Sequence, residues 1–198
     1  MRNLLACCGF AFAVFCSQES ARGSIVVTLS EVGSDVVASG SGTLNVAALS
    51  FEKSGGSFSF MTANVASIIL GPTSGFAAGY SGISGPYNFG GGGSVLSATS
   101  GFGDVFGLLG QGGTPLLTVP QDYTSGTELF GRTTWGGKNF ATLGVTPGTY
   151  VWTWGTGSTA DSFTLQIGGT STATPEPGTF GLFALAGPGL MVLRRVRG

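Results

Sequence analysis

The chain of 198 residues contains no histidine, and charged side chains make up only 9% of it. Histidine is the commonest general base near neutral pH and the commonest ligand of transition metals. Its absence excludes a Ser-His-Asp triad and any zinc site built on imidazole. The sequence therefore offers few of the side chains on which enzymes depend, and we expect no cofactor and no metal.

Residues 1–23 have the layout of a secretory signal peptide. Arg2 supplies the positive charge, and residues 4–15 form the apolar core. Ala21 and Gly23 provide a small-x-small cleavage site, so cleavage is predicted directly after Gly23. We expect export of the chain through an N-terminal signal helix.

All cysteines of the chain fall within this leader, at Cys7, Cys8 and Cys16. The mature chain, beginning at Ser24, then has no thiol chemistry and no disulfide bond. Its stability must come from buried apolar surface, which a domain of about 150 residues can supply unaided.

The mature region is weakly acidic, because it holds seven acids against three bases, a net charge of about −4. The acids are Glu31, Asp35, Glu52, Asp104, Asp122, Glu128 and Asp161, and the bases are Lys53, Arg132 and Lys138. Proteins that bind nucleic acids carry basic patches. This charge pattern therefore excludes a nucleic-acid partner.

Glycine is abundant, with 37 residues, whereas the charged helix formers are scarce. Together with many Ser, Thr, Val and aromatic residues, this composition is typical of strands and tight turns. We predict an all-β fold over residues 24–167, an antiparallel β-sandwich of jelly-roll or immunoglobulin-like type. Residues 168–174 are predicted to form a flexible linker.

Two hairpins are predicted from the spacing of apolar runs and turn residues. The first joins residues 24–30 to 36–41, and the second joins 150–154 to 162–167. Residues 80–94, rich in glycine and aromatic side chains, are predicted to form a long surface loop. Further strand-like runs lie at 43–49, 58–60, 65–70, 105–109, 116–119, 130–135 and 140–143.

The second hairpin opens with a Leu-x-x-x-Pro-Gly-Thr-Tyr pattern. This pattern resembles the late hairpin of bacterial extracellular β-sandwiches, in which a tyrosine often locks the entry to its strand. Tyr150, Trp152 and Trp154 stand two residues apart, so their rings share one face of the strand. They would either stack sugar rings on an exposed face, as in carbohydrate-binding modules, or fill the sandwich core, which is the favoured alternative.

Three patterns bear a superficial likeness to catalytic motifs. Ser50 to Lys53 matches Ser-x-x-Lys, but the Ser-Asp-Asn and Lys-Thr-Gly elements of penicillin-recognising enzymes are missing. Residues 136–139 lack the first glycine and the final Ser or Thr of a phosphate loop. A glycosidase needs two carboxylates about 5 to 9 Å apart. The candidates for such a pair are Asp104, Asp122, Glu128 and Asp161.

The C-terminal segment combines Pro175, Glu176 and Pro177 with an uncharged run at 178–193 and a terminal arginine cluster. The arginines are Arg194, Arg195 and Arg197. A helix needs roughly 17 to 25 apolar residues to span a bilayer, so this run lies at the lower limit. By the positive-inside rule the arginines stay in the cytoplasm and the upstream chain lies outside. We predict a short transmembrane helix that anchors the chain transiently in the inner membrane.

In this order, the three features of residues 175–198 resemble the PEP-CTERM sorting signal of bacterial exported proteins. The resemblance implies recognition by an exosortase, a membrane cysteine protease that cuts near Pro-Glu-Pro, and transfer to the outer surface or the medium. It also implies a Gram-negative envelope, often one with exopolysaccharide production. Pro188 departs from a regular spanning helix, since proline kinks or breaks helices. The alternative is a plain C-terminal membrane anchor.

The sequence as a whole favours a structural protein of the cell surface or extracellular matrix, without catalysis. The first alternative is a carbohydrate-binding module of the exopolysaccharide matrix that uses Tyr150, Trp152 and Trp154. The second is a histidine-free glycosidase. The expected partners are the exosortase, the membrane and exopolysaccharide.

Overall fold

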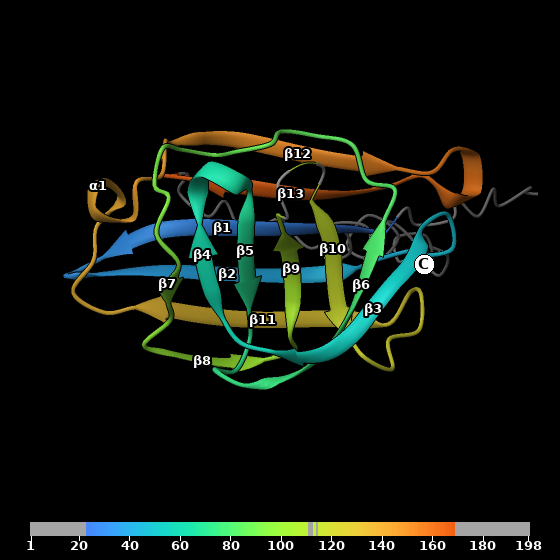
Figure 1. The fold of residues 1–198 in the computed structure, drawn as a ribbon, viewed down its shortest axis with the longest axis horizontal. Helices are drawn as coiled ribbons and strands as arrows, with labels where there is room; N and C mark the ends of the chain where they lie inside the picture. The colour runs from blue at the N-terminus through green and yellow to red at the C-terminus, as the bar shows by residue number, and fades with distance from the viewer. Residues whose placement is uncertain (1–22, 111–112, 114, 169–198) are drawn as a thin grey trace, which may run out of the picture.

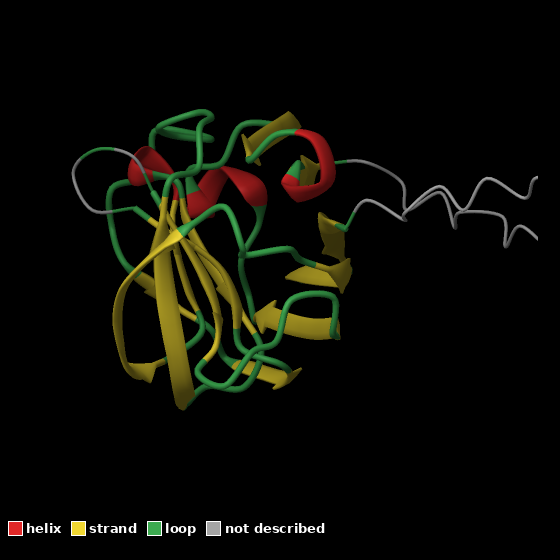
Figure 2. Cartoon of the chain, turned by 90° about the vertical axis from the view of Figure 1, so that its right-hand side faces the viewer, coloured by secondary structure: helices red, strands yellow, loops and turns green. Residues whose placement is uncertain are grey.

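The computed structural model describes residues 23–110, 113 and 115–168. In this part of the chain two β-sheets dominate, and helix is confined to three short turns (Figure 2). The turns are η1 (Ala63–Val65), α1 (Phe140–Leu143) and η2 (Gly157–Thr159). The all-β prediction is therefore confirmed. No helix within the described ranges is long and apolar enough to cross a membrane, and the predicted signal helix and sorting segment lie outside these ranges.

The first sheet has six strands in the order β12-β13-β1-β2-β11-β8. In chain order these strands are β1 (Ser24–Val32), β2 (Asp35–Thr43), β8 (Ser100–Gly103), β11 (Glu128–Trp135), β12 (Gly148–Trp154) and β13 (Asp161–Ile167). Neighbouring strands are antiparallel except β1 and β13, which run parallel with Val27 opposite Leu165. The prediction of a strictly antiparallel sandwich was wrong at this one pair.

The second sheet has seven strands in the order β3-β6-β10-β9-β5-β4-β7. In chain order they are β3 (Ser50–Ser57), β4 (Phe60–Thr62), β5 (Ser67–Leu70), β6 (Gly75–Ser81), β7 (Leu96–Ser97), β9 (Phe106–Leu109) and β10 (Leu116–Pro120). All pairings in this sheet are antiparallel.

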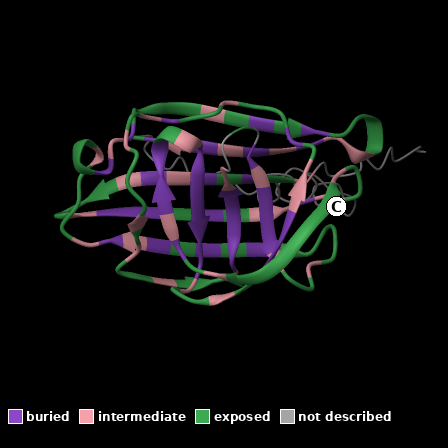
Figure 3. Ribbon diagram, viewed as in Figure 1, coloured by how far each residue is buried: buried purple, intermediate pink, exposed green. Residues whose placement is uncertain are grey.

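The two sheets face each other with their strands crosswise. Figure 1 shows β4, β5, β9 and β10 running across the strands of the six-stranded sheet behind them. This is the orthogonal class of sheet packing, whereas immunoglobulin-like sandwiches keep their sheets nearly aligned. The buried positions concentrate where the central strands of the two sheets overlap (Figure 3).

Both predicted hairpins are confirmed. β1 pairs with β2 along its whole length around a two-residue turn, in which Gly33 takes φ +62°, a conformation that favours glycine. β12 pairs with β13 from Gly148 to Trp154. The Tyr150 hydroxyl donates a hydrogen bond to the Thr146 carbonyl oxygen at 3.0 Å, as expected for a tyrosine that locks the strand entry.

The predicted strand at 43–49 was wrong beyond Thr43, because side chains bind its backbone in place of a neighbouring strand. The backbone N–H of Leu44 donates to the Tyr123 hydroxyl at 2.9 Å. The N–H of Asn45 donates to the Asp161 carboxylate. The segment therefore leaves the sheet as a loop.

Residues 140–143 form the helical turn α1, so the prediction of a strand there was wrong. The side chain of Asn139 accepts a hydrogen bond from the Thr142 N–H at 2.8 Å. In return, the Thr142 hydroxyl accepts one from the Asn139 N–H at 2.9 Å. This reciprocal cap, closed by Gly144 in the left-handed region, stabilises a helix start that the apolar pattern did not reveal.

The predicted loop at 80–94 starts after β6 and is packed against the core through Phe89. The Phe89 ring is fully buried. Its backbone N–H donates to the Ala63 carbonyl at 3.0 Å, and its carbonyl accepts from the Thr146 N–H at 2.9 Å. The loop therefore joins elements distant in sequence, and only parts of it, such as the exposed Tyr87, lie at the surface.

One aromatic side chain joins the centres of the two sheets. Phe106 in β9 is fully buried and lies over Gly40 of β2 and Gly131 of β11, which are paired with each other. A Cβ at Gly131 would lie 2.9 Å from the Phe106 ring, and one at Gly40 would lie 2.7 Å from the Val27 side chain. The bare backbone of this glycine pair thus forms the recess that the ring fills.

Replacement of Phe106 by alanine is expected to lower the free energy of unfolding by about 3–5 kcal/mol, because it leaves a cavity between the sheets. Urea unfolding followed by tryptophan fluorescence measures this change. The matched control is Phe102→Ala, on the outer face, which should stay within about 0.5 kcal/mol of the parent. Equal destabilisation by both substitutions would contradict the assigned role of Phe106.

Candidate functional site

The three aromatic residues predicted as a sugar platform lie in or against the core. Trp152 has no exposed surface and Trp154 only 5%, while Tyr150 is partly buried against the core, with its ring edge to face with Phe89. The indole N–H of Trp152 donates to the Pro86 carbonyl at 2.9 Å, and that of Trp154 to the Asn45 carbonyl at 2.7 Å. The favoured core alternative is confirmed for both tryptophans, whose buried rings cannot stack a sugar as the carbohydrate-binding alternative requires.

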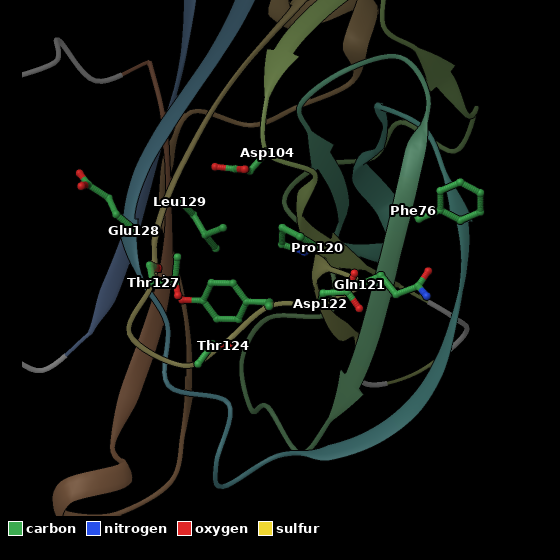
Figure 4. Close-up of a pocket in the computed structure, with 10 residues that line it drawn as sticks. Phe76, Asp104, Pro120, Gln121, Asp122, Thr124, Thr127, Glu128 and Leu129 are labelled. Carbon is green, nitrogen blue, oxygen red and sulfur yellow. Dashed lines mark hydrogen bonds between the residues drawn. The ribbon is translucent and has the colours of Figure 1, made fainter.

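Three of the four candidate carboxylates, Asp104, Asp122 and Glu128, line one hollow of about 640 Å³ beside Tyr123. Figure 4 shows the Glu128 carboxylate pointing outward, away from Asp122. Asp104 accepts a hydrogen bond from the Phe130 N–H at 3.0 Å and so fixes the start of the turn into β9. The hollow is therefore lined by three carboxylates, and those of Glu128 and Asp122 point apart.

Asp161, the fourth carboxylate, serves the backbone. It is buried with 7% of its surface exposed, and it accepts hydrogen bonds from the N–H groups of Asn45 and Ser162. Burial raises the pKa of the Asp161 carboxyl, against the opposing effect of these two hydrogen bonds. The carboxylate holds the loop after β2 against the start of β13.

The raised pKa of Asp161 predicts a pH dependence of stability. Above the unfolded-state pKa of about 3.9, the folded state retains the proton longer than the unfolded state does, so stability falls as the pH rises. In a chain that retains Gly23 and the residues before it, the parent should lose stability relative to Asp161→Asn as the pH rises from about 4 toward neutrality. Chemical unfolding at several pH values measures the difference. A gain of the parent over the variant across this range would contradict the assignment.

The other motif-like segments are structural. Ser50 and Lys53 belong to strand β3, so no helical turn brings the lysine back to the serine. The turn at 136–139 is held by the Gly137 N–H, which donates to the Asp35 carboxylate at 2.9 Å. Neither arrangement offers a nucleophile or a phosphate cradle.

A second surface, which the sequence did not single out, is the outer face of the six-stranded sheet. It carries a shallow groove of about 480 Å³ that crosses β13, β1, β2, β11 and β8. The groove is lined by Val26, Thr28, Ser39, Gly40, Ser41, Phe102, Phe130, Gly131, Arg132 and Gln166. We call this surface the outer groove.

Two phenylalanines at one end of the outer groove are open to solvent. Phe102 is 55% exposed and Phe130 48% exposed. Their rings meet edge to face, with centroids 5.6 Å apart and an interplanar angle of 61°. Exposed aromatic surface of this kind, rimmed by polar side chains, marks a binding site in many proteins.

Polar side chains complete the groove in a regular order set by the strand register. Gln166 lies opposite Thr28, Thr28 opposite Ser39, and Ser39 opposite Arg132, so that the row ends at Phe102. Within the described residues, no hydrogen bond engages the side chains of Thr28, Ser39 or Gln166. Their donors and acceptors are available to a ligand.

Strand alternation explains why these side chains point outward. In β11 the buried residues are Leu129, Gly131, Thr133 and Trp135, which leaves Phe130 and Arg132 on the other face. This alternation could be predicted from the sequence. The contact between Phe130 and Phe102 could not, because it depends on the pairing of β8 with β11.

Searches against protein-family models, curated proteins and solved structures found no match for this chain. The described residues define an all-β protein of two packed sheets.

Proposed function

We propose that this chain is an exported, non-catalytic protein of the bacterial envelope or its matrix, and that it binds extracellular polysaccharide in the outer groove. The observation that carries the binding proposal is the exposed Phe102–Phe130 pair next to unengaged hydroxyl and amide side chains. This proposal gives the structural role expected from the sequence a definite ligand. The domain holds matrix polysaccharide by a sheet face.

A polysaccharide suits this surface because a sugar ring has an apolar face and a rim of hydroxyl groups. The phenyl rings offer apolar contact. Thr28, Ser39 and Gln166 offer hydrogen bonds along one row, and Ser41 offers another in the neighbouring row beside Phe130. The groove runs across five strands and is open at the surface, which allows a long chain to lie along it. A small molecule would be better enclosed in a deep pocket.

Export and sorting are proposed from the two chain ends. The leader at 1–23, the Pro175–Pro177 motif and the terminal arginines support recognition by an exosortase after transient anchoring in the inner membrane. The jelly-roll-like sandwich class is part of the same proposal, supported by the two packed sheets. The immunoglobulin-like class is less favoured because the sheets cross.

The neighbourhood of Gly23 supports cleavage at that position. A Cβ on Gly23 would lie 2.8 Å from Asp161 Oδ2. Removal of the leader would therefore create the Ser24 ammonium group beside a buried carboxylate for which the described residues provide no cationic partner. Such a pair would lower the pKa of Asp161 and stabilise the mature fold.

Binding is tested with exopolysaccharide isolated from the native host, using the mature protein in affinity electrophoresis or calorimetry. Phe102→Ala and Phe130→Ala are each expected to weaken binding about tenfold, or about 1.4 kcal/mol, because each removes an apolar contact. The control is Phe51→Ala. Phe51 is exposed and also packs edge to face, against Tyr80 at 5.8 Å, but it lies on the other sheet. Unchanged binding in both groove variants would refute the site.

Processing is tested by intact mass spectrometry of the protein recovered from the envelope and the medium of an exosortase-positive host. The expected product begins at Ser24 and ends near Pro175–Pro177. In a host lacking the exosortase, the product should retain the C-terminus and remain in the membrane fraction. A product that extends through Gly198 in both hosts would contradict sorting.

A further inference from the structure

We infer that the polysaccharide bound in the outer groove is anionic, with carboxylate groups on its sugars, and that Arg132 recognises the carboxylate. This inference rests on the proposed function and specifies its ligand class. It is drawn from the charge of the groove and from the position of Arg132 between the aromatic pair and the polar row.

The groove has a charge opposite to that of the domain as a whole. Arg132 is the one charged side chain among the groove residues, and no carboxylate lines it. The mature region, in contrast, carries seven acids against three bases. The groove lining therefore offers a polyanion one cation and no carboxylate, and Glu128 follows on the same face of β11 beyond Phe130.

Arg132 is free to bind a ligand. It is exposed, and no salt bridge joins it to a carboxylate of the described residues. A guanidinium group binds a carboxylate through two parallel hydrogen bonds, an arrangement that gives both energy and orientation. Arg132 therefore favours a sugar with a carboxylate group over one that has only hydroxyl groups.

The register places Arg132 where the carboxylate of a stacked sugar would lie. Arg132 is directly opposite Phe102 on β8 and two residues from Phe130 on its own strand. Residues two apart along a strand are separated by roughly 6.8 Å, close to the dimension of one sugar ring. A uronic acid ring stacked on the phenyl pair can therefore direct its carboxylate to Arg132. The next sugar then faces Ser39 and Thr28.

The test uses two polymers with the same backbone, polygalacturonate and its methyl ester. Esterification converts each carboxylate into an uncharged group. The mature exported protein should bind polygalacturonate at least tenfold more tightly than the ester, and salt should weaken only the first interaction. Arg132→Gln should remove this preference and leave binding to the ester unchanged. Arg132→Lys should keep part of it, because lysine retains the charge but loses the two-fold hydrogen bonding.

Lys138→Gln is the matched control, since Lys138 is an exposed base in the turn after β11, outside the groove. It should bind both polymers like the parent. Equal affinity of the parent for both polymers would overturn the anionic ligand and leave polysaccharide binding intact. An equal effect of the Arg132 and Lys138 substitutions would show general charge attraction and would also overturn it. Absence of binding to either polymer and to the host exopolysaccharide would refute the proposed function itself.

Discussion

The contact on which the structure depends is that of the Phe106 ring with the paired glycines Gly40 and Gly131. The two sheets cross, so their central strands meet over a small area, where side chains from both sheets compete for space. Glycine at both positions removes that competition from the six-stranded sheet. The large ring can then reach its backbone, and dense packing results without strain. A Cβ at Gly131 would have to displace the ring or separate the sheets, and one at Gly40 would collide with Val27.

The same contact determines the outer groove. Because Gly131 must face Phe106, the alternation of β11 turns Phe130 and Arg132 to the opposite face. A shift of one residue in register would bury Arg132 and expose Trp135, at a high energetic cost, because an unpaired charge would leave water. The inner face of the sheet is therefore what fixes the chemistry of its outer face.

The fold could be predicted from the sequence where the determinants are local. The two hairpins have short turns and clear apolar runs, and Tyr150 bonds to a carbonyl only four residues away. The site could not be predicted, because it requires β8 and β11 to be neighbours and the Trp152 ring to be covered by the segment around Pro86. The spacing of Trp152 and Trp154 is compatible with either face of a sheet. Only the position of the second sheet decides which face is covered.

The aromatic end of the groove is held in place before any ligand arrives. Phe102 stands between Gly101 and Gly103, whose backbones lie against the carbonyl groups of Gly71 and Phe130. A side chain at either glycine would collide with these carbonyls, and Gly103 also takes a φ of +92°. The short strand β8 is thus pressed against its neighbours on both sides of the exposed ring. Since a backbone packed in this way has little freedom to lose on binding, the proposed contact of Phe102 with a sugar would contribute more to affinity than the same contact made by a mobile loop.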